Sequence, residues 1–302
     1  MSIVMTVNLK GGVAKTTTSV AVAECLASEG YRTLLIDADH QCSSSELLLG
    51  EERQFKTELS KRNLYQLLMD MMFDTTFAAD QFEKRMVRRV SNIGGGLEKL
   101  AVLPCSIRMD EILMKMRIKQ RGMDWDELLQ RLTRWRGHFS KWMRQEFDHV
   151  IIDCPPSFAF QVKFFLSVAD TFIVPCVPDR LSVNGSKYLM DRIQTCRFRL
   201  KGLGVLWTLY RDGNHLHRRR VEAARNGADP DLETLPPPFE TVIPNAAGIA
   251  EATELVRSKP ATFSRKYAEF APLFKKLTAE ILQRTELQQT EDAEVEPVLV
   301  EV

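Results

Sequence analysis

A short glycine-containing loop near the start of the chain carries the residue types needed to hold a nucleoside triphosphate. The loop reads Asn8-Leu9-Lys10-Gly11-Gly12-Val13-Ala14-Lys15-Thr16-Thr17. In loops of the pattern GxxxxGK[ST], successive backbone amides cradle phosphate oxygens, the lysine reaches the β- and γ-phosphates, and the hydroxyl ligates Mg²⁺. Lys15 and Thr16 match the end of this pattern, whereas Ala14 and Leu9 replace its two glycines. The loop predicts a site for ATP and Mg²⁺.

Carboxylates follow two apolar stretches further along the chain. Asp37 and Asp39 come directly after residues 32–36, and Asp153 ends residues 149–153. In open α/β sheets, ligands bind at the carboxyl ends of the strands. Because Asp37 and Asp39 are two positions apart on an extended chain, their side chains point to the same side. We therefore expect these acids to face the bound phosphates.

The surrounding pattern predicts the elements that position these residues. A buried strand at 3–7, a helix at 15–28 and a strand at 32–36 form a βαβ unit. Further strands are expected at 97–104, 149–153, 171–177 and 204–209, with helices at 183–195 and 260–283 and a mostly helical region over 51–144. Residues 226–238 are expected to form a loop. We predict an α/β fold with one P-loop NTPase domain over residues 1–284, a mostly parallel sheet and extra helices mid-chain. The acidic tail, 285–302, is expected to be disordered.

Composition limits the remaining possibilities. The formal net charge is +1, so a nucleic-acid partner would need a local basic patch. Six cysteines are scattered without a CxxC pair, which favours reduced, buried thiols in a reducing compartment. The N-terminus lacks the features of a signal peptide, and no stretch approaches the ~18 apolar residues that span a bilayer. We expect a cytoplasmic protein without membrane attachment.

The loop resembles the deviant phosphate-binding signature KGGxxK[ST] of the ParA/MinD family of P-loop ATPases, and the chain as a whole resembles its ParA partition type. Lys10-Gly11-Gly12-Val13-Ala14-Lys15-Thr16 fits that signature completely. Other family landmarks follow in order: Asp37-Ala38-Asp39 with Gln41, Asp153-Cys154-Pro155-Pro156-Ser157, and Thr241-Val242-Ile243-Pro244. The match covers residues 1–283 and is weak in the helical middle.

The resemblance assigns roles to individual residues. Lys10 is expected to reach the partner's nucleotide across a dimer, as an arginine finger does in other NTPases. Asp39 is expected to orient the attacking water, because no glutamate follows Asp153, and turnover is then slow. Pro155-Pro156-Ser157 is expected to sense the γ-phosphate. The implied catalytic residues are Lys10, Lys15 and Asp39; the metal site is Thr16, Asp37 and Asp153; and the nucleotide-binding residues are Lys10, Gly11, Gly12, Val13, Ala14, Lys15, Thr16, Thr17 and Pro244.

The same resemblance implies an ATP-dependent homodimer that binds DNA without sequence specificity and positions a plasmid, a chromosome or another cargo. Hydrolysis, stimulated by a ParB-like or cargo-linked activator, would reset the switch on the nucleoid. Phosphate contacts need only clustered basic residues. The candidates form three clusters, of which Arg218 to Arg220 is the first choice: Arg211 with Arg218, Arg219 and Arg220; Arg197, Arg199 and Lys201; and Arg257, Lys259, Arg265 and Lys266. Besides Ala14, His40 departs from the family, which usually has Pro-Gln-Gly where this chain has His40-Gln41-Cys42.

Three alternatives remain open from the residues. A MinD-like membrane-associated ATPase ends in a basic amphipathic helix, whereas this chain ends in acidic residues, and the aromatic face at 263–274 is expected to be core. An iron-sulfur reductase of the same fold needs two cysteines in glycine-rich loops, which the six cysteines do not provide. A scaffold that uses ATP only as glue is disfavoured by Asp39.

Overall fold

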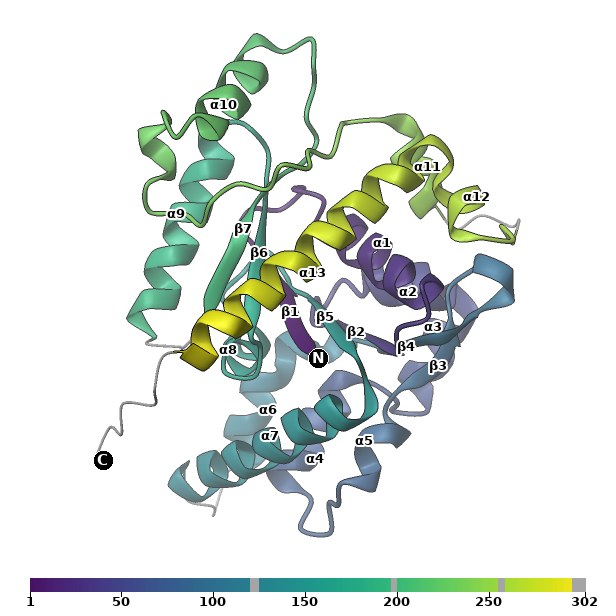
Figure 1. Cartoon of the computed structure of the whole chain (residues 1–302). Helices are drawn as coiled ribbons and strands as arrows, with labels where there is room; N and C mark the ends of the chain where they lie inside the picture. Colours follow the sequence, from purple (N-terminus) through teal and green to yellow (C-terminus); the bar gives the residue numbers. More distant parts are fainter. Residues whose placement is uncertain (120–124, 197–199, 255–258, 295–302) are drawn as a thin grey trace.

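A seven-stranded sheet forms the centre of the molecule, and helices cover both of its faces (Figure 1). The computed structural model describes residues 1–119, 125–196, 200–254 and 259–294. The strand order is β3-β4-β2-β5-β1-β6-β7, and every neighbouring pair is parallel except β3 and β4. The strands are β1 Ser2–Thr6, β2 Thr33–Asp37, β3 Val87–Val90, β4 Leu97–Leu103, β5 His149–Asp153, β6 Thr171–Cys176 and β7 Lys201–Trp207.

The helices alternate with the strands along the chain, which confirms the predicted α/β fold with a mostly parallel sheet. The α-helices are α1 Lys15–Ser28, α2 Ser43–Leu49, α3 Glu51–Leu59, α4 Leu64–Phe73, α5 Asp80–Lys84, α6 Ile112–Lys119, α7 Trp125–Glu146, α8 Phe160–Leu166, α9 Arg180–Thr195, α10 His215–Arg225, α11 Ala247–Thr253, α12 Phe263–Tyr267 and α13 Ala271–Glu294. Four 3₁₀ turns in the described residues are η1 Ile93–Gly95, η2 Ile107–Glu111, η3 Pro230–Leu232 and η4 Ala268–Phe270.

The sheet separates two parts of the hydrophobic core. Alternate residues of β1 point to opposite faces, so Ile3 and Met5 pack with α4, α6, α7, α8 and α9, while Val4 packs with α1, α2, α11, α12 and α13. Burial of both faces explains why the central strands read as continuous apolar runs and not as alternating ones. The phosphate loop thus leaves a strand that is held rigidly from both sides.

Helix α1 has the bounds that the sequence predicted. It is rich in alanine, serine, threonine and valine, and every residue from Thr18 to Ala27 is buried. Small side chains allow this helix to pack between the sheet and α13, where α1 contacts both. The element that follows the phosphate loop is therefore fixed on two sides.

The C-terminal region differs from the prediction of one helix over 260–283. Pro272 lacks an amide proton, so a helix running through it would lose a hydrogen bond and clash with the preceding turn. The chain instead forms α12, breaks at Ala268 with φ +46°, and restarts so that Pro272 lies in the first turn of α13. Helix α13 then continues to Glu294, beyond the predicted start of the disordered tail at 285, and 295–302 lie outside the described residues.

Other elements were also missed or misplaced: α8, α10 and α11 were not predicted, and β7 begins three positions earlier than predicted. Strand β3 was not predicted, because its sequence Val-Arg-Arg-Val has only two apolar residues, and it pairs antiparallel at the edge of the sheet. Helix α9 begins three positions earlier than predicted, since Asp179 caps it by accepting a hydrogen bond from the Ser182 amide at 2.7 Å. The capping residue Asp179 also belongs to the functional site.

Candidate nucleotide site

The phosphate loop and the predicted acids meet at the carboxyl edge of the sheet. The loop follows β1. Strand β5, which pairs with β1, ends at Asp153, and β2, which pairs with β5, ends at Asp37. In the strand register Thr6 lies opposite Asp153, and Asp153 lies opposite Asp37. The structure therefore brings together residues that are more than a hundred positions apart in the sequence.

The loop backbone adopts left-handed conformations at two positions. Gly12 has φ +69°, and Ala14 has φ +58° and ψ +33°. Ala14 stands where the general pattern has glycine, and a side chain in this region costs about 1–2 kcal/mol. Helix α1 begins directly afterwards without a side-chain cap. Its first amides are thus available to an anion at the helix N-terminus.

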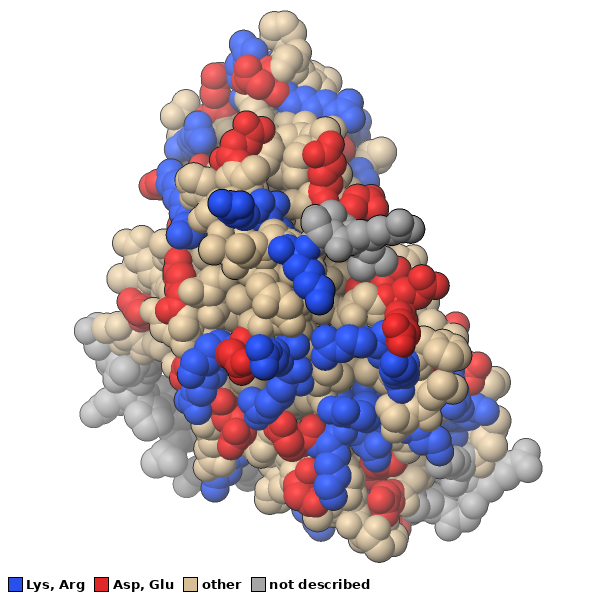
Figure 2. All heavy atoms as spheres, turned by 90° about the vertical axis from the view of Figure 1, so that its right-hand side faces the viewer, with Lys and Arg blue, Asp and Glu red and all other residues tan. Residues whose placement is uncertain are grey.

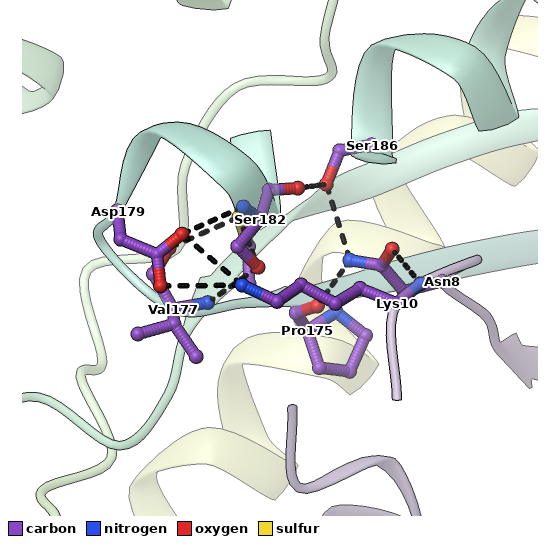
Figure 3. Close-up of polar contacts among 8 residues, drawn as sticks. Asn8, Lys10, Pro175, Val177, Asp179, Ser182 and Ser186 are labelled. Carbon is purple, nitrogen blue, oxygen red and sulfur yellow. Dashed lines mark hydrogen bonds and ion pairs between the residues drawn. The ribbon is translucent and has the colours of Figure 1, made fainter. Parts of the chain in front are cut away.

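The two lysines of the loop point in different directions. Lys15 is buried, and its Nζ donates a hydrogen bond to the Lys10 carbonyl at 2.9 Å. Burial lowers the pKa of Lys15, an effect that the nearby Asp153 opposes. Lys10 instead extends away from the loop toward Asp179 at the start of α9 (Figure 3), with its Nζ 3.3 Å from Oδ1 and 3.4 Å from Oδ2. Only the Lys15 side chain folds back onto the loop.

Asp153 and Asp37 are fully buried, but their oxygens are used differently. Asp37 accepts hydrogen bonds from the Asp39 amide at 3.1 Å, the Ser45 amide at 2.9 Å and the Ser45 hydroxyl at 2.5 Å. Asp153 accepts one from the Ser19 hydroxyl at 3.2 Å, while its Oδ2 is buried without a hydrogen-bond partner. Burial raises the pKa of Asp37 to about 6 and, together with the charge of Asp37, raises that of Asp153 to about 7.

The Asp153 carboxylate fits a divalent cation. A buried oxygen without a donor next to the phosphate loop is what a hydrated Mg²⁺ could satisfy, since Mg²⁺ keeps several waters and takes one or two carboxylates besides the phosphates. Asp153 offers that oxygen, whereas both oxygens of Asp37 already accept hydrogen bonds, from the Asp39 amide and from Ser45 of α2. In the part of the chain that the structure describes, no group of three or more His, Cys, Asp or Glu side chains could hold a metal by itself.

Asp39 follows β2 at the same carboxyl edge of the sheet. Its side chain is 10% exposed, and its Oδ1 accepts a hydrogen bond from the Gln41 amide at 3.0 Å. His40 Nδ1 is 3.5 Å from the same oxygen. Cys42 has φ +57°, a left-handed conformation that suits the glycine found there in the family. The departures at His40 and Cys42 therefore lie in the turn that holds Asp39.

Neighbouring loops complete the wall of the site. A Cβ added to Gly11 would lie 3.9 Å from Pro156, so the loop after β5 abuts the phosphate loop. Thr208 Oγ1 donates to the Val13 carbonyl at 3.0 Å. The segment that ends in Pro244 pairs with Tyr210 after β7. Pro244 therefore lies at the same edge as the phosphate loop.

Sequence analysis missed several residues of this site. Ser19 is one helical turn after Lys15, which accounts for its bond to the Lys15 carbonyl, but its contact with Asp153 has no signal in the sequence. Thr208 directly follows β7. It could have been found because ligands bind at the carboxyl ends of parallel strands. Asp179 could have been recognised only as a helix cap, because nothing in its local sequence connects it to Lys10, 169 positions earlier.

The basic candidates are not equivalent. Arg219 is exposed, while Arg218 donates to the Asp212 carbonyl at 2.8 Å and stays 46% exposed. Arg220 is only 20% exposed and pairs with Asp231 at 3.1 Å and Asp229 at 3.7 Å. With the Asn245 amide oxygen turned toward it, Arg211 donates to that oxygen at 2.8 and 3.0 Å.

The remaining candidates are dispersed. Arg197, Arg199 and Arg257 lie outside the described residues. Lys266 is buried and pairs with Glu24 at 2.7 Å, which leaves Arg265 and Lys259 exposed. Figure 2 shows a broken band of Lys and Arg over the side of the molecule that carries α12 and β3, with Asp and Glu side chains beside it. That mixture agrees with the net charge of +1 and does not single out one cluster.

Further predictions concerned the aromatic face, the cysteines and membrane-spanning helices. Of the predicted aromatic face, Phe263, Tyr267 and Phe274 are buried in the core, and Phe270 is partly buried against it. Five of the six cysteines are buried free thiols, and Cys196 is exposed. Among the described residues, no helix is long and apolar enough to span a membrane.

The sheet order, the loop after β1 and the acids that end β2 and β5 define a P-loop ATPase. The chain belongs to the AAA_31 family, described as an AAA domain, whose model matches residues 1–202, and it is a P-loop ATPase of the ParA type.

Known relatives agree with this assignment. The sporulation initiation inhibitor protein Soj of Bacillus subtilis strain 168 is 25% identical over 254 residues, which cover 83% of this chain and 87% of Soj. The fold matches that of pnob8 ParA with a TM-score of 0.67, 20% identity, and coverage of 95% of this chain and 99% of that one. It also matches cobyrinic acid a,c-diamide synthase of Mycobacterium smegmatis, crystallised with an ATP analog and magnesium, with a TM-score of 0.62, 23% identity, and coverage of 95% and 96%. The last two likenesses concern the fold alone.

Proposed function

We propose that the chain is an ATP-switched homodimer that binds DNA without sequence specificity and positions a plasmid, a chromosome or another cargo. ATP would close the dimer and create the DNA-binding form. Hydrolysis, stimulated by a ParB-like or cargo-linked protein, would open it. The protein would then cycle between the nucleoid and the cytoplasm.

The direction of Lys10 carries this proposal. One lysine in the loop, Lys15, already occupies the position that contacts the β- and γ-phosphates. Lys10 leaves the loop and stays 32% exposed at the surface beside α9. We infer that this partly exposed ammonium, next to a phosphate site but outside it, serves a second nucleotide. The dimer would then share its two nucleotides through Lys10.

The remaining residues support slow hydrolysis at this site. Thr16 and Asp153 would hold Mg²⁺, which when bound neutralises charge on the phosphates. Asp39 would accept a hydrogen bond from the attacking water and orient it toward the γ-phosphate. The turn at Gln41 fixes one Asp39 oxygen and leaves the other for this task. A single oriented carboxylate without a following glutamate suits a timer better than a metabolic enzyme.

For DNA we propose the exposed side of α10, with Arg219 as the principal phosphate contact and Arg218, whose Nε is 3.9 Å from the Asp212 carboxylate, as a secondary one. Phosphate contacts of this kind require cations that are not already neutralised. Arg220 is therefore assigned to the protein's own structure, where two carboxylates surround it. Helix α10 follows the loop after β7, so it lies beside the edge that binds the nucleotide.

DNA binding should be measured by fluorescence anisotropy with ATP, with ADP and without nucleotide, for the wild type, Lys10→Ala and Asp39→Ala. We expect wild-type protein to bind random-sequence DNA only with ATP. Lys10→Ala should bind ATP but neither dimerise nor hold DNA. Asp39→Ala should remain dimeric and DNA-bound with ATP, because hydrolysis no longer resets it.

Two results would contradict the proposal. Equal DNA affinity in all three nucleotide states would exclude a nucleotide switch. Normal ATP-dependent dimerisation of Lys10→Ala would exclude the role of that lysine in the partner's site. Each measurement should be made at a stated salt concentration, because phosphate contacts weaken steeply as salt rises.

A further inference from the structure

Asp179 lies beside the phosphate loop and binds the ammonium of Lys10 within one chain (Figure 3). The Nζ of Lys10 is within 3.4 Å of both carboxylate oxygens. Both side chains are partly exposed, at 32% for Lys10 and 39% for Asp179. The pair is thus accessible to water and can open without uncovering a buried charge.

The backbone of Lys10 is held in place separately from its side chain. The Lys10 amide donates to Asn8 Oδ1 at 3.0 Å. Asn8 Nδ2 in turn donates to the Pro175 carbonyl at 2.7 Å and to Ser186 Oγ on α9 at 3.1 Å. A Cβ added at Gly185 would lie 3.6 Å from the Lys10 Cβ, so α9 approaches the loop closely. Only the four-carbon stem and ammonium of Lys10 are left to move.

Asp179 therefore has two separable tasks. Its Oδ1 caps α9 through the Ser182 amide, and its charge binds Lys10. The cap requires only an acceptor oxygen, which asparagine also provides. The ion pair requires the negative charge. A single substitution can remove the second task and keep the first.

We propose that Asp179 is a positioning residue that retains Lys10 in its own subunit, so that this pair must open before Lys10 can reach the nucleotide of a partner. The inference rests on the proposed role of Lys10 in the dimer. A conformational change responds only to differences in free energy between its two states. The pair stabilises the retained position of Lys10, and it thereby raises the ATP concentration at which the dimer closes. Pairs as exposed as this one are weak, so Asp179 sets a threshold and does not act as a lock.

The test uses the full chain and a slowly hydrolysed ATP analogue with Mg²⁺. Dimerisation is followed by sedimentation velocity at fixed protein concentration while the analogue is titrated. Asp179→Asn should lower the concentration for half-maximal dimerisation by about 1.5- to 5-fold. Asp179→Glu, which restores the charge, should return this concentration toward the wild-type value. A purely structural defect would raise it.

Asp191→Asn is the matched control, because Asp191 is exposed on the same helix and the substitution removes the same charge. It should leave the titration unchanged. If Asp179→Asn dimerises at the wild-type concentration or requires more analogue, or if Asp191→Asn has the same effect as Asp179→Asn, the inference is overturned while the dimer model stands. If wild-type protein stays monomeric at saturating analogue, the proposed function fails, and the inference fails with it.

Discussion

The carboxylate of Asp153 is fully buried, and one of its oxygens lacks a hydrogen bond. Its pKa of about 7 means that the folded protein retains a proton there that the unfolded chain releases near its ordinary value of 3.8. Stability from this group is therefore fully present below pH 3.8 and is lost progressively as pH rises from there through about 7. Burial of the charged carboxylate lowers the stability of the folded protein, and bound Mg²⁺ and nucleotide would offset this loss, as expected where function and stability conflict.

Replacing Asp153 with asparagine should raise the stability of the nucleotide-free protein at pH 8, raise it less at pH 5, and have little effect only below its ordinary pKa of 3.8. Thermal unfolding should show a higher Tm at pH 8, by roughly 2–4 °C for each 1 kcal/mol regained. The variant should also lose the stabilisation that Mg²⁺ and ATP give the wild type.

Asp148→Asn is a control with the opposite sign. The hydrogen bond from Arg32 lowers the pKa of Asp148, so its stabilising effect is present above the ordinary pKa and is lost on acidification. Asp148→Asn should therefore lower Tm at pH 8. If Asp153→Asn also lowers Tm at pH 8, the burial cost assigned to Asp153 is wrong.

At the scale of elements, helix α10 shows how adjacent residues of one type can have different tasks. Arg219 is exposed, whereas Arg220 lies between Asp229 and Asp231 of the following loop. Lys187 of α9 binds Asp231 as well, at 2.7 Å. Arg220 therefore links α9, α10 and the loop, and it is part of the fold in this region.

Arg219→Ala should weaken DNA binding and reduce the dependence of log affinity on log salt by about 0.9 if the side chain contacts one phosphate. Its Tm should stay within about 1–2 °C of the wild type, since surface changes usually alter stability by less than about 0.5 kcal/mol. Arg220→Ala should do the reverse: it should lower Tm and leave the salt slope unchanged. An unchanged salt slope for Arg219→Ala would remove α10 from the DNA surface.

The elements that the sequence located well are those with a strong local cause. Helix α1 follows a phosphate loop and consists of small helix-compatible residues, and β5 is a continuous apolar run that stops at Cys154-Pro155. Strand β3 was missed because an edge strand needs few apolar residues; Arg88 and Arg89 point outward there and pair with Glu83 and Glu98. Pro272 was visible in the sequence, but periodicity was given more weight than its missing amide proton.

The candidate site was predictable where a residue's role depends on its own strand or loop. The loop residues and the acids that end β2 and β5 follow this rule. Partnerships across the fold did not follow from local sequence: Asp179 reads as a helix cap, and Arg220 reads as one of three equal arginines. Their charges are assigned only when α9, α10 and the phosphate loop are placed side by side.

At the scale of the whole molecule, an apolar stripe lies next to Lys10 at the edge that the proposed dimer would use. Leu181 and Tyr188 of α9 are 73% and 69% exposed. They are seven positions apart and so share one helix face, with Gly185, which approaches Lys10, between them. Because a two-fold interface uses the same patch on both subunits, any contact made there is made twice. A nucleotide-closed dimer that engages Lys10 would cover this stripe.

Leu181→Glu should therefore weaken ATP-dependent dimerisation by about 10- to 100-fold, a loss of about 1–3 kcal/mol, as measured by sedimentation with a slowly hydrolysed analogue. The substitution should leave the monomer folded, since glutamate in the first turn of α9 faces the positive end of the helix dipole. Leu287→Glu is the matched control, because Leu287 is 59% exposed on α13. Nearby Gln289 donates to the Met1 carbonyl just before β1, so this part of α13 lies at the amino ends of the strands, away from the phosphate loop. Normal dimerisation of Leu181→Glu, or an equal loss in Leu287→Glu, would place the dimer interface elsewhere than on α9.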